Sequence, residues 1–547
     1  MKNRRDFLKG LGVGGIGLKM LVCESIFNGL AAKAFAQSMG ARDIQNFIHL
    51  SLLGGPPRWL FDLPMRPGGN DTLNHNPMVM TRFTRSSITS VMDNSTSYTT
   101  HQIAGLHFPH LWSANVPTSS GARPLSELAR HGIFIRGMNT GADGHGVNRV
   151  KMSAPISGSP STSGLFSDLK STPITAVRRG TNLNFKGETG KGEIDAGGTN
   201  PLLTIMSPFN LTGNAFLSDS SSTSDFNRLT KAVSDQVGKN NPYLKSVLGD
   251  KKNALELVKR GVGDLGTIYG NLFAKYKGLM EQALTQSWLP GVDDLDIISP
   301  NSNAASNFPF RIRSSGTQRV IPRNNNLRDT LTQNSMVSNL AESFALAEYL
   351  IMNDLSSSVT LGVGDLMNLS FLNALDSGTG ANLTANNFRS INDAHDTGAY
   401  ATLFYFSKFY LALSSCMLEL VRVLKANQKF TKTLIQVSSE FNRSARSNGT
   451  GSDHGWRGSN VSLYSGKIQA PEIIGNISAG GTGATYEGTW GVAAPSSEIG
   501  NREINIGNMI SSVSTILGIR SVTSNDQSLV YEQGGVIKSI MSRGRNV

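Results

Sequence analysis

Cysteine is scarce in this chain, which has two among 547 residues, Cys23 and Cys416. If an N-terminal leader containing Cys23 is removed, Cys416 stands alone, and no disulfide can form within the chain even in an oxidising compartment. Long apolar runs are lacking as well. No stretch beyond the N-terminal segment is long enough to span a bilayer, so we expect no transmembrane segment in the mature chain.

Dense basic runs are also missing. The chain carries 51 Lys and Arg against 39 Asp and Glu, a formal charge of +12. The first 36 residues supply six basic and two acidic groups, so the remainder is +8 (12 − 4). That excess is spread along the chain, with no cluster of Lys and Arg interleaved with aromatic residues. We therefore do not expect a nucleic-acid partner.

The N-terminus has the pattern of a targeting segment. Residues 3–9, Asn-Arg-Arg-Asp-Phe-Leu-Lys, are similar to the twin-arginine export motif. A Gly-rich, weakly apolar stretch follows, and Ala34-Phe35-Ala36 fits a small-x-small cleavage site. We predict a signal peptide at 1–36, recognition by the twin-arginine export machinery, and a single mature domain at 37–547. The expected location is periplasmic or secreted, because this route carries folded proteins across the membrane.

Histidine is rare in the second half of the chain. Of nine His, only His395 and His454 follow His145. Each has an Asp within two residues on its N-terminal side, Asp393 and Asp453. Imidazole and carboxylate together suit zinc or manganese. Asp-His pairs also occur by chance in polar loops, and that alternative stays open.

The stretch 434–456 places one of these pairs at a predicted sheet edge. Its start, Leu-Ile-Gln-Val, is typical of a buried strand. A polar loop with Arg443 and Arg446 follows and ends on Asp453-His454. In open α/β sheets, ligands bind beyond the carboxyl ends of the strands. We therefore expect a site here.

Two stretches resemble a known family. Gly54-Gly55-Pro56, followed by Phe61-Asp62-Leu63-Pro64, resembles the start of the exported bacterial family called domain of unknown function 1501. Ser439-Glu440-Phe441-Asn442-Arg443, followed by Asp453-His454, is similar to a second motif of that family. The family is related to the alkaline phosphatase and sulfatase superfamily. In this chain Arg58-Trp59-Leu60 occupies the turn where the family has its first Asp, a metal ligand in the superfamily.

The resemblance implies an α/β fold like that of alkaline phosphatase. This is a three-layer sandwich whose central, mostly parallel sheet has helices on both faces, with insertions at about 170–325 and 365–391. It also implies the site residues. Metal ligands would be Asp393, His395, Asp453 and His454, with Asp62 and His145 as weaker candidates and Asp365 as a possible substitute. Catalytic candidates are Ser161 and Thr162 as nucleophiles and Arg443 as the group that holds an anionic substrate. A hydroxyl at a helix start is also the commonest helix cap, and a loop histidine can be purely structural.

Two functions follow as hypotheses. The first is a metal-dependent hydrolase of phosphate or sulfate esters, with zinc or manganese and an unknown anionic substrate. The second is a catalytically degenerate exported protein, without a required metal, that serves in binding or surface assembly. Residues 47–53, Phe-Ile-His-Leu-Ser-Leu-Leu, are predicted to form the first strand, which ends at Gly54-Gly55-Pro56-Pro57. Arg58 in the turn after this strand favours the second hypothesis, since a guanidinium at short range repels a cation. The Asp-His pairs favour the first.

Overall fold

The computed structural model describes residues 43–66, 101–197, 267–286, 311–320, 336–363, 399–445, 452–478 and 492–542, except positions 157, 171, 173, 175, 182, 184, 189–192, 315–316 and 524–525. The predicted signal peptide lies outside the described residues, as do Asp365, Asp393 and His395. None of the described helices is both long and apolar enough to cross a bilayer.

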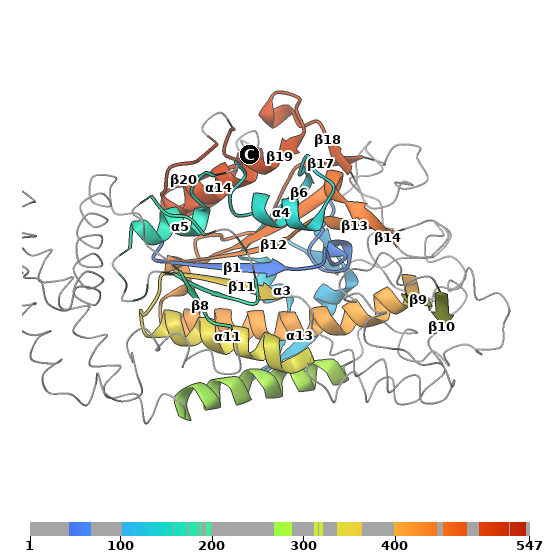
Figure 1. Cartoon of the computed structure of the whole chain (residues 1–547), viewed down its shortest axis with the longest axis vertical. Helices are drawn as coiled ribbons and strands as arrows, with labels where there is room; N and C mark the ends of the chain where they lie inside the picture. Colours follow the sequence, from blue (N-terminus) through green and yellow to red (C-terminus); the bar gives the residue numbers. More distant parts are fainter. Residues whose placement is uncertain are drawn as a thin grey trace, which may run out of the picture.

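A nine-stranded sheet forms the centre of the described structure (Figure 1). Its middle strand, β1 (Asn46–Leu52), pairs in parallel with β11 (Ser358–Val363) on one side and β12 (Thr433–Ser439) on the other. Among the strands of this sheet, only β15 runs antiparallel to its neighbours. The α/β class with a central, mostly parallel sheet is therefore confirmed. The outer strands are β7 (Val177–Arg179) and β8 (Ile194–Asp195) beyond β11, and β15 (Ser459–Tyr464), β6 (Gly132–Asn139), β16 (Glu472–Ile474) and β19 (Ile504–Asn505) beyond β12.

The sequence of β1 explains its central place. Every residue of the strand is buried. Ile48, Leu50 and Leu52 belong to one apolar cluster, whereas Phe47 belongs to a second one with Leu434 of β12. Because alternate side chains of a strand point to opposite faces, both faces of the sheet are covered, as is usual for parallel strands.

Helices pack on both faces of the sheet (Figure 1). On one face lie α11 (Met336–Met352) and α13 (Ala399–Ala426), and a helix at 267–285 covers α11, where Tyr276 donates a hydrogen bond to Glu348 at 2.6 Å. On the other face lie α4 (His145–Lys151), α5 (Thr162–Asp168) and α14 (Ile506–Leu517). Apolar residues recur every three or four positions from Leu403 to Leu424, a spacing that predicts one long amphipathic helix. The structure has this helix as α13, which also contains the buried Cys416.

The remaining elements are short. The segment expected to be a variable insertion, 170–325, contributes β7 and β8 to the central sheet. Outside that sheet lie three-to-four-residue hairpin strands and a few single turns of helix: β2 (His101–Ile103), β3 (Leu106–Phe108), β4 (Asn115–Thr118), β5 (Gly121–Pro124), α3 (Ser126–Ala129), β9 (Arg311–Ser314), β10 (Thr317–Val320), β13 (Asn442–Ala445), β14 (Ser452–Gly455), β17 (Asn476–Ser478), β18 (Val492–Ala494), β20 (Val530–Gln533), β21 (Val536–Ser539), η1 (Arg58–Leu60), η4 (His110–Ser113), η7 (Phe430–Lys432), η8 (Trp456–Gly458), η9 (Ser497–Ile499) and η10 (Ile540–Ser542).

His49 of β1 makes the stability of this core depend on pH. Its ring is buried, and Nε2 lies 2.7 Å from the Ser438 hydroxyl. Burial lowers the pKa of His49 from 6.5 to about 4. The unfolded chain therefore takes up a proton on this histidine as pH falls below 6.5, while the folded chain does so only near 4, so acidification favours unfolding. We expect a loss of about 3 kcal/mol between pH 7 and 4.

This expectation can be measured by urea unfolding at several pH values. His49→Gln removes the titrating group and keeps a side chain that can bond Ser438. Its stability should vary less between pH 6.5 and 4 than that of the natural protein. An equal dependence on pH in the two proteins would show that His49 is not the group responsible.

Candidate functional site

Two loops bring the candidate site residues together beyond the carboxyl ends of parallel strands. After β12, the chain forms the antiparallel pair β13 and β14, in which Arg443 faces His454 and Ser444 faces Asp453. After β6, a loop leads to α4, whose first residue is His145. Because β6 and β12 run in the same direction on either side of β15, both loops lie at the same edge of the sheet.

The rings of His145 and His454 meet at this edge. Their Nε2 atoms are 3.1 Å apart, and the ring planes are at 85° with centroids 4.6 Å apart. Each Nδ1 atom is hydrogen-bonded to a carboxylate: that of His145 to Glu440, and that of His454 to Asp143 at 2.5 Å. The structure therefore brings together His145 and His454, both predicted as ligands, and adds a carboxylate behind each ring.

The carboxylates define which ring nitrogen is available. An Nδ1 beside a carboxylate carries the proton, so the Nε2 of a neutral ring presents a lone pair. Two lone pairs 3.1 Å apart require a shared proton or a cation between them. Nitrogens that bind one tetrahedral zinc ion at about 2.0–2.1 Å each lie roughly 3.3 Å apart. Carboxylates on the far nitrogens are the usual partners of metal-binding histidines. The described donors thus fit two ligands of one divalent ion.

Burial keeps the pKa of His454 below its ordinary value, and the charges of Arg443 and His145 lower it further, against a raising effect of the hydrogen bond to Asp143. The imidazole is therefore neutral at pH 7. A neutral imidazole is the form that binds a metal ion.

Arg149 and Phe441 fix the position of the pair. The Glu440 carboxylate is fully buried and accepts a hydrogen bond from Arg149 Nε at 2.7 Å, which leaves its other oxygen for His145. The Phe441 ring centroid lies 4.0 Å from that of His454 and 4.7 Å from that of His145. Each histidine ring is therefore held by a carboxylate at Nδ1 and by contact with the Phe441 ring.

Arg443 has a different setting from the one expected for a group that holds substrate. Its side chain is buried, and its guanidinium donates to the carbonyl oxygens of Gly55 at 2.8 Å and Gly54 at 2.6 Å. These contacts fasten the turn after β1 to β13. The guanidinium also lies 5.2 Å from the centroid of the Phe441 ring.

Asp62 is engaged in a buried ion pair. Its carboxylate accepts hydrogen bonds from Arg58 Nε at 2.7 Å and from Arg58 Nη2, and further ones from Asn460 and Ser462. Neither Arg58 nor Asp62 is exposed to solvent. Burial lowers the pKa of Arg58, but the charge of Asp62 and its hydrogen bond, together with the neighbouring Tyr410 and Tyr464, outweigh this effect, and the pKa is raised. In this arrangement Arg58 neutralises the carboxylate that the family resemblance assigned to a metal.

Ser161 and Thr162 are at the start of α5. The Ser161 hydroxyl accepts hydrogen bonds from the backbone of Gly164 at 3.1 Å and Lys186 at 3.0 Å, so it caps the helix. Thr162 Oγ1 lies 3.5 Å from the carbonyl oxygen of Ser153. In Figure 1, α5 is drawn at the opposite end of the sheet from β13 and β14. The structure does not bring these hydroxyls to the histidine pair.

The described residues do not form a closed metal site. Among them, no group of three or more His, Cys, Asp or Glu side chains is arranged to hold a metal ion. Asp453 is in β14, but its side chain is not among those described, and Asp393 and His395 lie outside the described residues. What is described is a pair of imidazole nitrogens supported by Glu440 and Asp143.

Three residues of the site carried no assigned role in the sequence: Asp143, Glu440 and Arg149. A signal for Asp143 exists, because it precedes His145 by two residues, as Asp393 precedes His395. Its partner is nonetheless His454, 311 residues away. Arg149 is one helical turn after His145, a spacing that places both side chains on one face of α4.

Comparisons with known proteins give little further information. The chain matches no model of a known protein family. It also matches none of the curated proteins. Among solved structures, it is similar to the PsFucS1 sulfatase from Pseudoalteromonas sp., with 10% sequence identity and a TM-score of 0.27, over 91% of this chain and 72% of the sulfatase chain. At this TM-score the similarity assigns neither fold nor activity, so the fold rests on the sheet topology of the chain itself.

Proposed function

We propose that this chain is an exported metal-dependent hydrolase-like protein that acts on phosphate or sulfate esters, with the three-layer architecture of the alkaline phosphatase-like superfamily. The observation that carries the proposal is the His145–His454 pair, whose Nε2 atoms converge while carboxylates hold both Nδ1 atoms. The pair also lies beyond the carboxyl ends of parallel strands, where α/β proteins bind their ligands.

In this proposal, His145 and His454 hold one zinc or manganese ion, and its remaining ligands come from the candidates Asp453, Asp393 and His395. A divalent ion supplies Lewis acidity at this position. The chain's own residues orient it: Glu440, fixed by Arg149, and Asp143 set the tautomer of each ring. Phe441 excludes water from one side of the pair. The substrate is an unidentified anionic ester.

Metal analysis of the folded, exported protein tests the proposal. We expect zinc or manganese to copurify, and His454→Ala and His145→Ala each to lose most of it, because each removes one nitrogen of the pair. His110→Ala, in η4, serves as a control that should retain the metal. Hydrolysis of 4-nitrophenyl phosphate and 4-nitrophenyl sulfate should depend on the same two histidines. A metal content that neither substitution changes, or a protein indifferent to chelators, would contradict the assignment.

The Arg58–Asp62 ion pair favours a second candidate function, a catalytically degenerate member of the fold that serves as an exported binding or surface-assembly protein. The Asp62 carboxylate, in the turn that follows β1, is bonded on both oxygens by Arg58, Asn460 and Ser462, so no second cation is expected there. The two candidate functions differ in whether the protein hydrolyses esters. Metal retained without any ester hydrolysis would favour the degenerate protein.

Export is proposed through the twin-arginine pathway, from Arg4 and Arg5 in the N-terminal motif. We expect the double substitution Arg4→Lys and Arg5→Lys to leave full-length, uncleaved protein in the cytoplasm, because that machinery distinguishes the paired guanidinium groups from ammonium groups. As a control, Lys2→Arg changes a basic residue outside the Arg4-Arg5 pair without changing the net charge, and this variant should be exported normally. Immunoblots of cytoplasmic and periplasmic fractions give the result. Normal cleavage of the double variant would place export on another route.

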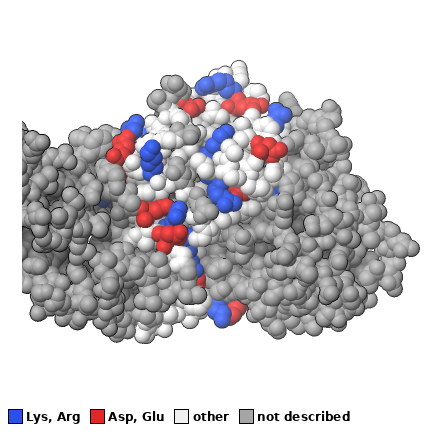
Figure 2. Space-filling model, in the orientation of Figure 1, with Lys and Arg blue, Asp and Glu red and all other residues white. Residues whose placement is uncertain are grey.

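The proposal includes no nucleic-acid partner, because the sequence has no dense basic run. On the described part of the face shown in Figure 2, Lys and Arg side chains alternate with Asp and Glu. Such mixed charge does not form the continuous basic path that phosphate backbones require.

A further inference from the structure

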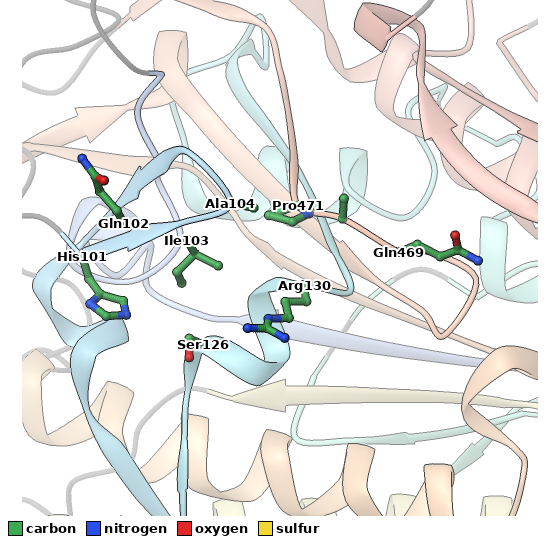
Figure 3. Close-up of a pocket in the computed structure, with 9 residues that line it drawn as sticks. His101, Gln102, Ile103, Ala104, Ser126, Arg130, Gln469 and Pro471 are labelled. Carbon is green, nitrogen blue, oxygen red and sulfur yellow. The ribbon is translucent and has the colours of Figure 1, made fainter. Parts of the chain in front are cut away.

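A cavity of about 420 Å³ lies between the β2–β3 hairpin, α3 and the segment before β16 (Figure 3). This volume falls in the range of roughly 300–1,000 Å³ that is usual for small-molecule sites. Both polar and apolar residues line the cavity, among them His101, Ser126, Arg130, Ile103, Ala104 and Pro471.

The cavity is separate from the histidine pair. Arg130 precedes β6, and residues 469–471 precede β16, which runs parallel to β6. Asp143 and His145 follow the other end of β6. A strand of eight residues, Gly132–Asn139, is about 23–26 Å long at roughly 3.3 Å per residue. A molecule in the cavity therefore cannot reach the proposed metal site.

Arg130 gives the lining of the cavity a positive charge. Arg130 is the one lining residue with a formal charge, since no Asp or Glu lines the cavity. Figure 3 shows the Arg130 guanidinium turned toward Ser126, with the His101 ring along the same side. Within the described part of the chain, none of these three side chains has a hydrogen bond or ion pair to another described residue. The nearby Glu127 is bonded to Arg123 instead, at 3.0 Å.

The cavity also has an apolar surface. Ile103, Ala104 and Pro471 form it, and Ile103 is buried (Figure 3). A hydrogen bond joins the two segments that form the cavity: Nδ1 of His131, next to Arg130, lies 2.9 Å from the carbonyl oxygen of Ile468, next to the lining segment 469–471. A bare inorganic oxyanion would contact the guanidinium but leave this apolar surface in water, whereas an organic anion would cover both.

We propose that this cavity binds a small organic anion, with its carboxylate or sulfate ester oxygen atoms on Arg130, Ser126 and His101 and its apolar body on Ile103, Ala104 and Pro471. A guanidinium presents paired N–H donors that match the oxygens of a carboxylate or sulfate. Arg130 supplies a single positive charge, because burial lowers the pKa of His101 and its ring is neutral at pH 7. One charge with two neutral partners suits a monoanion.

Isothermal titration calorimetry of the full exported chain tests this proposal with hexanoate, 4-methylphenyl sulfate, uncharged hexanamide and inorganic sulfate as probes. We expect saturable binding of hexanoate or 4-methylphenyl sulfate, and at least tenfold weaker binding of hexanamide and inorganic sulfate. Whichever of the two organic anions binds more tightly identifies the headgroup. Arg130→Gln should weaken the tighter anion at least tenfold, since it removes a charge-assisted bond.

Arg123→Gln is the matched control, because Arg123 is an exposed arginine, as Arg130 is, but lies outside the cavity and pairs with Glu127. It should bind the organic anions as the natural protein does, and thermal unfolding checks that both variants fold. His454→Ala should also bind normally, which separates this site from the proposed metal centre. Three results would each overturn the proposal: no saturable binding, binding that Arg130→Gln leaves unchanged, or inorganic sulfate binding as tightly as the organic anions.

Discussion

Replacing Asp62 by alanine is expected to lower the free energy of unfolding by about 3–5 kcal/mol, because it leaves the Arg58 guanidinium buried without its counterion. Both side chains have no solvent exposure, and Arg58 bonds the Asp62 carboxylate through Nε at 2.7 Å and through Nη2. The same substitution removes one of the two acceptors of Asn460, which donates to the carboxylate at 3.0 Å and to the backbone carbonyl oxygen of residue 62 at 3.2 Å. Urea or guanidinium unfolding of the natural protein and the variant measures the loss.

Two further variants separate the ion pair from other effects. The double substitution Arg58→Met and Asp62→Leu removes both charges, and it should cost less than Asp62→Ala alone, since no unpaired charge is left behind. Glu127→Ala breaks an exposed ion pair of the same i, i+4 spacing with Arg123, and should cost under about 1 kcal/mol. If Asp62→Ala cost no more than Glu127→Ala, the pair would not hold the turn after β1 as described.

This ion pair was not predicted from the sequence. From the sequence, Arg58 is a charge that repels a cation, and Asp62 is a separate candidate ligand. In the structure the two residues bond each other within one tight turn. Their spacing of four residues is compatible with such a pair. Nothing in the local pattern distinguishes a carboxylate that faces a neighbouring arginine from one that faces a metal, because that depends on how the turn packs against Asn460 and Ser462.

The central strands were more predictable than the outer ones. β1 and β12 are apolar runs bounded by glycine and polar residues, and these signals are local. β7 and β8 have three and two residues, too few to show a periodicity. The meeting of His145 with His454 depends on sheet order, since β15 separates β6 from β12. A sequence identifies each histidine as a candidate, but not the neighbour it will contact across 309 positions.

Gly55→Ala is expected to destabilise the fold by about 2–5 kcal/mol and to disturb the histidine pair. Gly55 has φ of +63°, in the left-handed region, where a side chain costs roughly 1–2 kcal/mol. A β-carbon at this position would lie 2.6 Å from Cδ2 of Phe441 and closer still to Cε2. Overpacking of this kind costs about 1–3 kcal/mol. Because the Phe441 ring contacts both histidine rings, its displacement reaches the proposed metal site.

Gly534→Ala provides a matched control for the backbone conformation alone. Gly534 has φ of +60°, close to that of Gly55, and a β-carbon there would meet no atom within 4 Å. The difference in unfolding free energy between the two variants therefore reports the contact with Phe441. We expect Gly55→Ala to be the less stable by at least about 1 kcal/mol, and to shift the imidazole resonances of His145 and His454 in NMR spectra, which Gly534→Ala should leave in place. Equal stability of the two variants, with unchanged imidazole resonances, would contradict this prediction. It would mean that Gly55 is required only for its positive φ, and that a change in the turn after β1 does not displace Phe441 against the histidine pair.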